Sequence, residues 1–369
     1  MKKLIPLLFL PVMAHAGFSK PELMARFMAL DAWKAPDNMW CFSGEPTALN
    51  NKIYLNCMDI DGNLMVSWDQ GKFEVAARAN SETLFSKPLV AFNRVNWYEF
   101  EEFSPLRTFV ASDKLEVRTI SNLGPMSSSP TDSFLPLTKD TFFFKNKWED
   151  SQLWSWKNNV VTAFFNPEAA YIFTPHPGLN GEIAFKTRHL STDESAPDKL
   201  WHYNGKEWKV VLQDKDAQKD SQWKSFRHQL SVEGDKIVVV ANDGTTDSLL
   251  LITGNKVQVL ARAGKELKEL DFFSPKIQAG TIVIRGVDFQ GNKAVYVKDN
   301  GPFRKLITQG DIVQADKGAA MVYYPNEHAI FYGAPGLDEK GNIYLQATLS
   351  DPHHPETLLG IGLLKFKKE

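Results

Sequence analysis

Acidic and aromatic side chains recur in polar segments along this chain, each following a short run of β-branched or aromatic residues. Carboxylates can attract or bind cations, and an indole or phenol ring can stack on a sugar ring or an aliphatic chain. If these segments share one face of the fold, they predict a binding surface there. The residues that we expect to contact a ligand are Trp97, Tyr98, Trp148, His189, Asp243 and Asp288.

The same residue types also have ordinary roles in exposed turns, so two interpretations stay open. Asp, Glu and Gly belong in such turns, and Asp in particular bonds to its own backbone. Alternatively, the carboxylates form a ring around a central pore, where they would attract cations or hold one metal ion. The segments 93–105 and 188–198 are the longest, and we expect them to wall a cleft.

Two short motifs resemble parts of metal sites, and we interpret both as loops. Asp59-Ile-Asp-Gly-Asn resembles the opening of a calcium-binding loop, but the twelfth position holds Gln70 instead of Glu. His353 and His354 are adjacent, and neighbouring side chains on an extended chain point apart. We therefore predict a turn at Asp59 and a solvated loop at the two histidines.

The sequence contains no signature of nucleophilic catalysis. It has no G-x-S-x-G, no H-E-x-x-H and no phosphate-binding glycine loop. We therefore predict a non-catalytic binding or scaffolding protein without a cofactor. The alternative is a metal-dependent enzyme, namely a lactonase, a hydrolase or a polysaccharide lyase, with Ca²⁺ or another divalent ion near the centre of the fold.

The elements that must position these residues recur with a fixed period, with a mean spacing of about 48 residues. Two further β-runs follow the first in each repeat, and turns such as Asn204-Gly205 suit hairpins. This pattern predicts an all-β fold, a β-propeller of seven four-stranded antiparallel blades, with six or eight blades as alternatives. The first strong runs start at Ile53, Val90, Phe142, Ile183, Ile237, Ile282 and Ile343.

Some of these segments resemble a known kind of repeat. Leu337-Asp-Glu-Lys-Gly-Asn-Ile-Tyr-Leu resembles a segment of bacterial propellers of the NHL and sugar-lactonase-like kind, with weaker echoes at Asp59 and Asp288. Phe273-Ser-Pro-Lys-Ile resembles the inter-blade linker of exported bacterial propellers, and we place Pro175-His176-Pro177 in such a linker. The resemblance implies the fold but no activity, because propellers serve as enzymes, receptors and scaffolds alike.

The N-terminus has the pattern of a signal peptide over residues 1–16. Lys2 and Lys3 precede an apolar run, and Ala14-His15-Ala16 forms a cleavage signal. The chain is therefore predicted to be exported to the periplasm or the outside of a bacterial cell. We expect residues 17–36 to be a lead-in segment, with a short helix or turn over 20–33. The propeller would then span 37–369, and residues 37–42 would supply the strand that closes the ring.

Composition and cysteine content indicate which classes of binding partner to expect and whether a disulfide forms. A formal net charge of −2 gives no electrostatic reason to expect nucleic-acid binding, and no later stretch approaches a transmembrane segment. We expect a monomer whose ligand is a glycan or an envelope protein. Cys41 and Cys57 are the two cysteines, and export favours a disulfide between them, with two buried thiols as the alternative.

Overall fold

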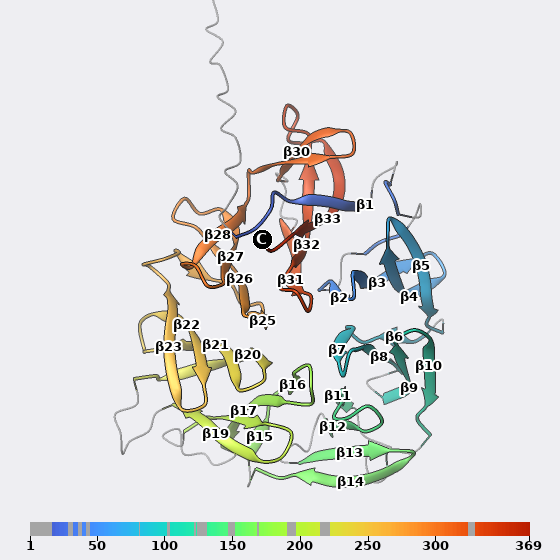
Figure 1. Cartoon of the computed structure of the whole chain (residues 1–369), viewed down its shortest axis with the longest axis vertical. Coiled ribbons are helices and arrows are strands. Elements are labelled where there is room, and N and C mark those ends of the chain that lie inside the picture. Colours follow the sequence, from blue (N-terminus) through green and yellow to red (C-terminus); the bar gives the residue numbers. More distant parts are fainter. Residues whose placement is uncertain are drawn as a thin grey trace, which may run out of the picture.

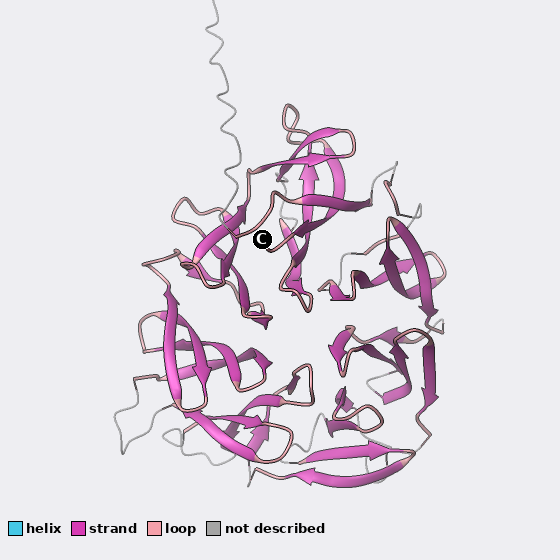
Figure 2. Cartoon of the chain, in the orientation of Figure 1, coloured by secondary structure: helices cyan, strands magenta, loops and turns pink. Residues whose placement is uncertain are grey.

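The computed structural model describes residues 17–28, 32–35, 39–41, 45–80, 82–101, 104–121, 123, 131–146, 152–167, 170–189, 197–214, 222–323 and 329–369. They form seven antiparallel sheets arranged as a ring, and none of these residues is helical (Figures 1 and 2). The predicted seven-bladed all-β propeller is confirmed. The signal peptide predicted over residues 1–16 lies outside the described residues.

Blades 1 to 3 follow one another along the first half of the chain, each with its first strand nearest the centre of the ring (Figure 1). Blade 1 contains β2 (Thr47–Leu49), β3 (Lys52–Asp59), β4 (Gly62–Asp69) and β5 (Lys72–Arg78). Blade 2 contains β6 (Leu84–Phe85), β7 (Leu89–Ala91), β8 (Arg94–Glu101), β9 (Ser104–Ala111) and β10 (Leu115–Thr119). Blade 3 contains β11 (Thr131–Pro136), β12 (Phe142–Asn146), β13 (Leu153–Lys157) and β14 (Val160–Phe165).

Blades 4 to 6 repeat this order, and in blades 2, 4 and 6 the innermost strand is split into two short pieces. Blade 4 contains β15 (Ala170–Ile172), β16 (His176–Pro177), β17 (Ile183–His189), β18 (Lys199–Tyr203) and β19 (Trp208–Gln213). Blade 5 contains β20 (Ser225–Glu233), β21 (Lys236–Asn242), β22 (Asp247–Thr253) and β23 (Lys256–Arg262). Blade 6 contains β24 (Glu269–Leu270), β25 (Lys276–Gln278), β26 (Thr281–Val287), β27 (Lys293–Lys298) and β28 (Arg304–Thr308).

Blade 7 combines both ends of the chain. An extra hairpin, β29 (Ile312–Ala315) and β30 (Gly318–Val322), precedes β31 (Phe331–Leu337), β32 (Ile343–Ser350) and β33 (Leu358–Phe366). The outermost strand is β1 (Glu22–Phe27), which pairs antiparallel with β33 and lies beside it in Figure 1. The N-terminal segment therefore closes the ring.

The closing strand differs from the prediction in both conformation and position. Residues 20–33 were expected to hold a short helix or turn, but β1 is extended and all but its first residue are buried. The apolar residues have the spacing of a helix, but the segment forms a strand, because pairing with β33 satisfies the backbone groups of an otherwise open sheet edge. Within 37–42, the described residues contribute one isolated bridge, Trp40 to Met58. The lead-in predicted for 17–36 thus contains a blade strand.

Hairpin turns follow the expected chemistry. Asn50 and Asn51 join β2 to β3, and Asn158 and Asn159 join β13 to β14, all four with positive φ. Two successive positive φ values match the right-handed twist of the flanking strands, and Asn tolerates them well. Such turns explain why short strands pair locally in every blade.

Polar side chains on the second strands, three of the four buried, join neighbouring blades. The Lys145 and Lys186 ammonium groups donate to backbone carbonyls of the innermost strand of the next blade, at 2.9 and 2.8 Å. Arg285 and Asn56 make the same kind of bond, each at 2.9 Å. These bonds fix how the innermost strands sit around the axis, because each crosses from one blade to the next.

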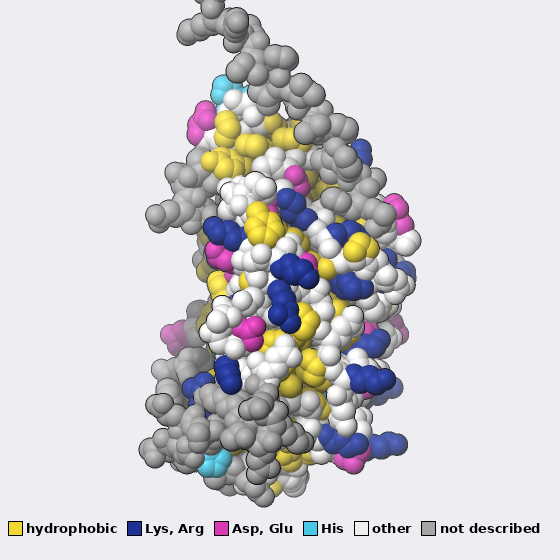
Figure 3. All heavy atoms as spheres, turned by 90° about the vertical axis from the view of Figure 1, so that its left-hand side faces the viewer, with side chains coloured by type: hydrophobic (Ala, Val, Ile, Leu, Met, Phe, Trp, Pro, Cys, Tyr) yellow, Lys and Arg dark blue, Asp and Glu magenta, His cyan; other side chains and the backbone are white. Residues whose placement is uncertain are grey.

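The disulfide between Cys41 and Cys57 is confirmed, with a sulfur–sulfur distance of 2.01 Å. It ties the segment that precedes blade 1 to β3. The outer rim carries scattered Lys and Arg side chains among apolar ones, as Figure 3 shows for one side. No helix in the described part of the chain is long and apolar enough to cross a membrane.

Candidate functional site in the central cavity

The innermost strands share a proline that the prediction of blade positions did not use. It occupies the same register position in five of the seven blades, one residue before the first cavity-facing residue of the strand. Proline cannot donate to a β-ladder, so it is tolerated here because the innermost strand is an edge strand. The five prolines are Pro46, Pro88, Pro175, Pro275 and Pro335.

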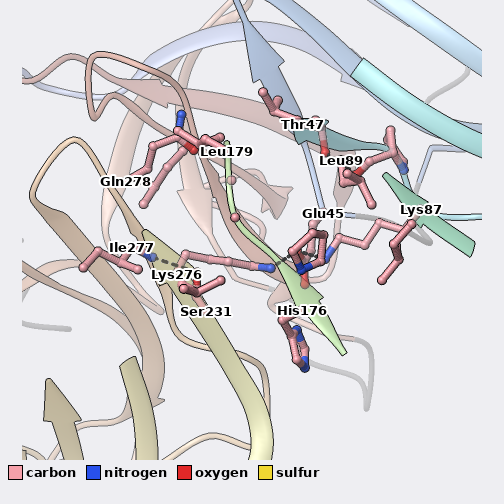
Figure 4. Close-up of a pocket in the computed structure, with 18 of the residues that line it drawn as sticks. Glu45, Thr47, Lys87, Leu89, His176, Leu179, Ser231, Lys276, Ile277 and Gln278 are labelled. Carbon is pink, nitrogen blue, oxygen red and sulfur yellow. Dashed lines mark hydrogen bonds and ion pairs between the residues drawn. The ribbon is translucent and has the colours of Figure 1, made fainter. Parts of the chain in front are cut away.

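The next residue of each innermost strand lines a cavity of about 330 Å³ at the axis of the ring (Figure 4). Each of these residues pairs with an equivalent position on the second strand of its own blade. All seven blades therefore contribute to one ring of side chains, which we call the central ring. Its members are Thr47, Leu89, Leu135, His176, Ser231, Lys276 and Gly336.

Three charged side chains from different blades meet in this cavity, and we call them the Lys–Glu cluster. The Lys276 ammonium lies 2.6 Å from Oε2 of Glu45. Lys87 donates to the same oxygen (Figure 4). Two ammonium groups thus share one carboxylate, and no other Asp or Glu lines the described wall of the cavity. When both lysines are protonated, the cluster carries one positive charge in excess.

The geometry of blade 7 lets Lys276 reach Glu45. Blade 7 separates blade 6, which carries Lys276, from blade 1, which carries Glu45. Its central-ring residue is Gly336, which has no side chain to occupy that space. A Cβ at Gly336 would lie 1.8 Å from the carbonyl oxygen of Pro46, so glycine is needed for this close approach.

Burial in the cavity lowers the pKa of both lysines. Burial, followed by the neighbouring Lys276 ammonium, places the pKa of Lys87 well below its usual value. Burial lowers the pKa of Lys276 to about 8. The two side chains keep exposed fractions of 44% and 21%, so water in the cavity moderates both shifts. At neutral pH, Lys276 is therefore mostly charged, and the charge resides in a confined space.

His176 also lines the cavity, from β16 in blade 4. Its Nε2 lies 3.1 Å from the carbonyl oxygen of His228. Burial, together with the nearby Lys276 and Lys87, lowers the pKa of His176 to about 3, so the imidazole is neutral at physiological pH. The sequence interpretation put this residue in a linker between blades. It lies instead on the wall of the cavity, because its strand is the innermost of the blade.

The structure separates the two aromatic residues predicted to bind a ligand. The segment 93–105 is largely the strands β8 and β9 instead of a long loop, so the two residues point to opposite faces of a strand. Trp97 is 2% exposed and its ring stacks on Phe109 at 5.3 Å, inside the core. Tyr98 is half-buried and lines the central cavity.

Of the predicted polar residues, Asp243 and Asp288 lie at turns between second and third strands, and His189 ends a second strand. His189 is exposed at the end of β17. Asp243 accepts backbone bonds from Thr245 and Thr246, and these bonds lower its pKa. Asp288 is buried and accepts bonds from the backbone of its own turn and from Lys305 at 3.0 Å. Trp148 lies outside the described residues.

Among the residues that the structure describes, these turns place no ring of carboxylates around the pore. They connect the second and third strands, and the innermost strand of each blade lies between them and the axis. Asp59 likewise bonds to its own turn and to Arg78, as predicted for a simple turn. No group of three or more His, Cys, Asp or Glu is arranged to hold a metal ion among the residues that the structure describes.

The residues of the Lys–Glu cluster were not among the predicted site residues. The repeat was aligned on the long apolar second strands, and the innermost strands beside the cluster, β2, β7 and β25, are only three residues long, too short to show a β-pattern. The recurring proline was the available signal. In Glu45-Pro46, Lys87-Pro88 and Pro275-Lys276, a charged residue stands directly beside it.

The fold and the cavity define a seven-bladed β-propeller with a charged axial cavity. No family model matches the chain, and no curated protein sequence matches it. The NHL and sugar-lactonase-like resemblance therefore stays a prediction. Three solved structures share this fold with the chain.

A prolyl endopeptidase structure has a TM-score of 0.52 at 9% identity, over 89% of this chain and 50% of that one. A puromycin-hydrolysing peptidase of Mycobacterium tuberculosis has a TM-score of 0.52 at 10% identity, covering 86% and 52% of the two chains. An acylaminoacyl peptidase of Pyrococcus horikoshii has a TM-score of 0.52 at 11% identity, covering 84% and 51%. The chain thus spans about half the length of each, and at these identities the likeness shows the fold alone.

Proposed function

We propose that this protein is an exported, non-catalytic binding propeller that holds its ligand in the central cavity. The observation that carries the proposal is the meeting of Glu45, Lys87 and Lys276, from three blades, in an enclosed space of about 330 Å³. Concave sites with a few convergent polar groups are the usual form of ligand sites. A ligand from the cell envelope, a glycan or an envelope protein, would present one group to this cavity.

We call the end of the strands that carries the turns between second and third strands the loop face. Thr47, Leu89 and Lys276 of the central ring pair with Tyr54, Asn96 and Val283, each the third residue of its second strand. Second strands begin at the end opposite to the loop face, so the central ring lies nearer that opposite end. A ligand would therefore reach the cavity more directly from the end opposite to the loop face, which differs from the loop-face binding that the sequence predicts.

Export is supported by two features. The leader pattern of residues 1–16 is that of a secreted chain, and the Cys41–Cys57 disulfide suits an oxidising compartment. The protein would act in the periplasm or outside the cell, as a monomer.

A binding role accounts for the polar groups of the cavity better than nucleophilic chemistry does. The Ser231 hydroxyl oxygen accepts the backbone N–H of Ile277 at 3.2 Å, and the His176 ring is engaged with a backbone carbonyl. A serine nucleophile would instead need an adjacent base within hydrogen-bond reach. Both lysines are held by Glu45.

An enzyme is the second candidate, and one observation favours it. The imidazole of His176 is held neutral in the same cavity as two ammonium groups, which places a potential base beside cations. This candidate includes the metal-dependent lactonase, hydrolase or lyase predicted from the sequence. It predicts turnover that His176→Asn abolishes, and elemental analysis of the purified protein would test its metal requirement.

The test of the binding proposal is to fill the cavity. Leu89→Trp places a large side chain in the central ring without changing a charge, and Val257→Trp on the exposed face of β23 is the matched control. Binding to envelope extracts and to a glycan array should be lost in the first variant and kept in the second. Equal binding by both variants would show that the ligand sits elsewhere.

A further inference from the structure

With both lysines protonated, the Lys–Glu cluster is not electrically balanced. Two ammonium groups face one carboxylate in a cavity where His176 is neutral and no other acid lines the described wall. Charge pairs are stronger in such an enclosed space than in water, and an unpaired charge there is costly. One further negative charge from a ligand would balance the cluster.

Gln278 provides a second, independent sign of a missing partner. Its side chain is 9% exposed and lines the cavity, and its Nε2 has no hydrogen-bond partner among the described residues. Buried amide nitrogens in native proteins nearly always donate to something. A ligand oxygen in the cavity would give this amide an acceptor once the enclosed Nε2 turns toward it.

Lys276 and Gln278 lie on the same face of β25, because they are two residues apart on one strand. Same-face neighbours on a strand are separated by about 7 Å. A ligand that contacts both must therefore carry its negative charge at one end and a neutral oxygen acceptor some way along. Tyr98 adds an aromatic surface to the same cavity, and the Thr47 hydroxyl lies on the central ring.

We propose that the central cavity binds an acidic sugar, with its carboxylate between Lys87 and Lys276 and a ring or hydroxyl oxygen at Gln278. A sugar acid carries one negative charge, which would balance the cluster. It also has ring and hydroxyl oxygens some way from its carboxylate, which could reach Gln278, and a ring that could lie against Tyr98. A phosphate ester carries a charge nearer −2 and would overcompensate the cluster. The inference rests on the proposed function, in that it takes the cavity as the ligand site.

Four probes test the ligand class by calorimetric titration of the whole protein: glucuronate, glucose, glucose 6-phosphate and an acetylated dipeptide with a free carboxylate. Glucuronate should bind at least about tenfold more tightly than each of the others, as one added ion pair in a confined site would give. Equal binding of glucose would overturn the charge argument. Tighter binding of the phosphate or the dipeptide would overturn the sugar acid.

Variants of the cluster should move affinity in opposite directions. Lys276→Met should weaken glucuronate binding at least about tenfold, whereas Glu45→Gln should strengthen it, because the internal carboxylate no longer competes for the ammonium groups. Gln278→Leu should weaken glucuronate but leave acetate binding unchanged. Lys256→Met, on exposed β23, is the control and should change nothing. Equal losses for Glu45→Gln and Lys276→Met would contradict the assigned roles.

The two proposals can fail separately. If Leu89→Trp abolishes binding to envelope glycans while glucuronate binds no better than glucose, the cavity is the site and the acidic class is wrong. If glucuronate binds as expected but Leu89→Trp leaves envelope binding intact, the acid site stands and the envelope ligand sits elsewhere. Melting curves of every variant show whether a loss reflects binding or folding.

Discussion

The charged residues of the turns and those of the central cavity differ in where their partners come from. Asp243 and Asp288 bond mainly to the backbone of their own turns, within a few residues of the sequence. Glu45 and Lys276 come from blades at opposite ends of the chain and bond to each other. A carboxylate with local partners stabilises its own turn. A charge with distant partners joins parts of the ring or serves a site.

The closure of the ring includes a charge pair whose two members are also distant in the sequence. Arg26 on β1 makes two bonds to Asp316 beside the β29–β30 hairpin, at 2.9 and 2.7 Å, and both side chains are nearly fully buried. The pair is separated by 290 residues in the sequence.

Arg26→Ala should destabilise the protein by about 3–5 kcal/mol, because it leaves the buried Asp316 carboxylate without its partner. The free energy of unfolding from urea titration measures this change. Arg78→Ala, which breaks the exposed local pair with Asp59, is the control and should lower stability far less than Arg26→Ala does. Comparable losses in the two variants would remove the distinction between distant and local pairs.

Gly336→Ala should cost about 1–3 kcal/mol, because the added Cβ would meet the Pro46 carbonyl and push blade 7 away from blade 1. The shift would also move Glu45 away from Lys276, so glucuronate affinity should change together with stability. Thermal unfolding and calorimetry measure the two effects. Gly254→Ala, at a turn where a Cβ meets nothing within 4 Å, tests the backbone strain alone. Unchanged stability in Gly336→Ala would show that the two blades can separate freely.

Glucuronate affinity should fall as pH rises through about 8, by up to about tenfold per pH unit above that value. The sign follows from the pKa of Lys276, which lies below its usual value, so the ammonium is charged below pH 8 and neutral above it. Calorimetric titrations from pH 7 to pH 9.5 would measure the profile. Lys276→Met should flatten it. A constant affinity across this range in the unmodified protein would exclude Lys276 as the titrating group.

Asp243→Ala should have the smallest effect, a slight loss of stability with no change in binding. The Asp243 carboxylate accepts backbone bonds within its own turn, and the turn is two strands away from the axis. Backbone hydrogen bonds lower the pKa of Asp243 in the folded protein. Its contribution to stability is therefore present at neutral pH and is lost as the pH falls and the carboxylate becomes protonated. Urea titration and glucuronate calorimetry measure both quantities. Altered binding would place the loop turns in the ligand site.

The sequence predicted the fold well because the second strands are long and apolar. Ile237 and Ile282, for example, begin runs that are buried from both faces, and these runs repeat at nearly constant spacing. Innermost strands were not predicted where they are very short. The strand His176–Pro177, for example, has too few residues to show a periodic pattern. Trp97 and Tyr98 were misjudged because their segment was placed in a loop. On a strand, one of two neighbours faces the core.

The closing strand and the cluster were unpredictable for a common reason. The pairing of β1 with β33 and the meeting of Lys276 with Glu45 both depend on how the ring closes. Local sequence preference says nothing about contacts across more than two hundred residues, and here it favoured a helix or turn where a strand forms. The acidic turns were visible in the sequence because their bonding is local.

A crystal structure of the protein with saturating glucuronate tests the central claim most directly. The account predicts the sugar in the central cavity, its carboxylate within hydrogen-bond distance of Lys87 and Lys276 and an oxygen at Gln278. Glucuronate bound on the outer turns, or an empty cavity at a ligand concentration well above the measured Kd, would contradict it.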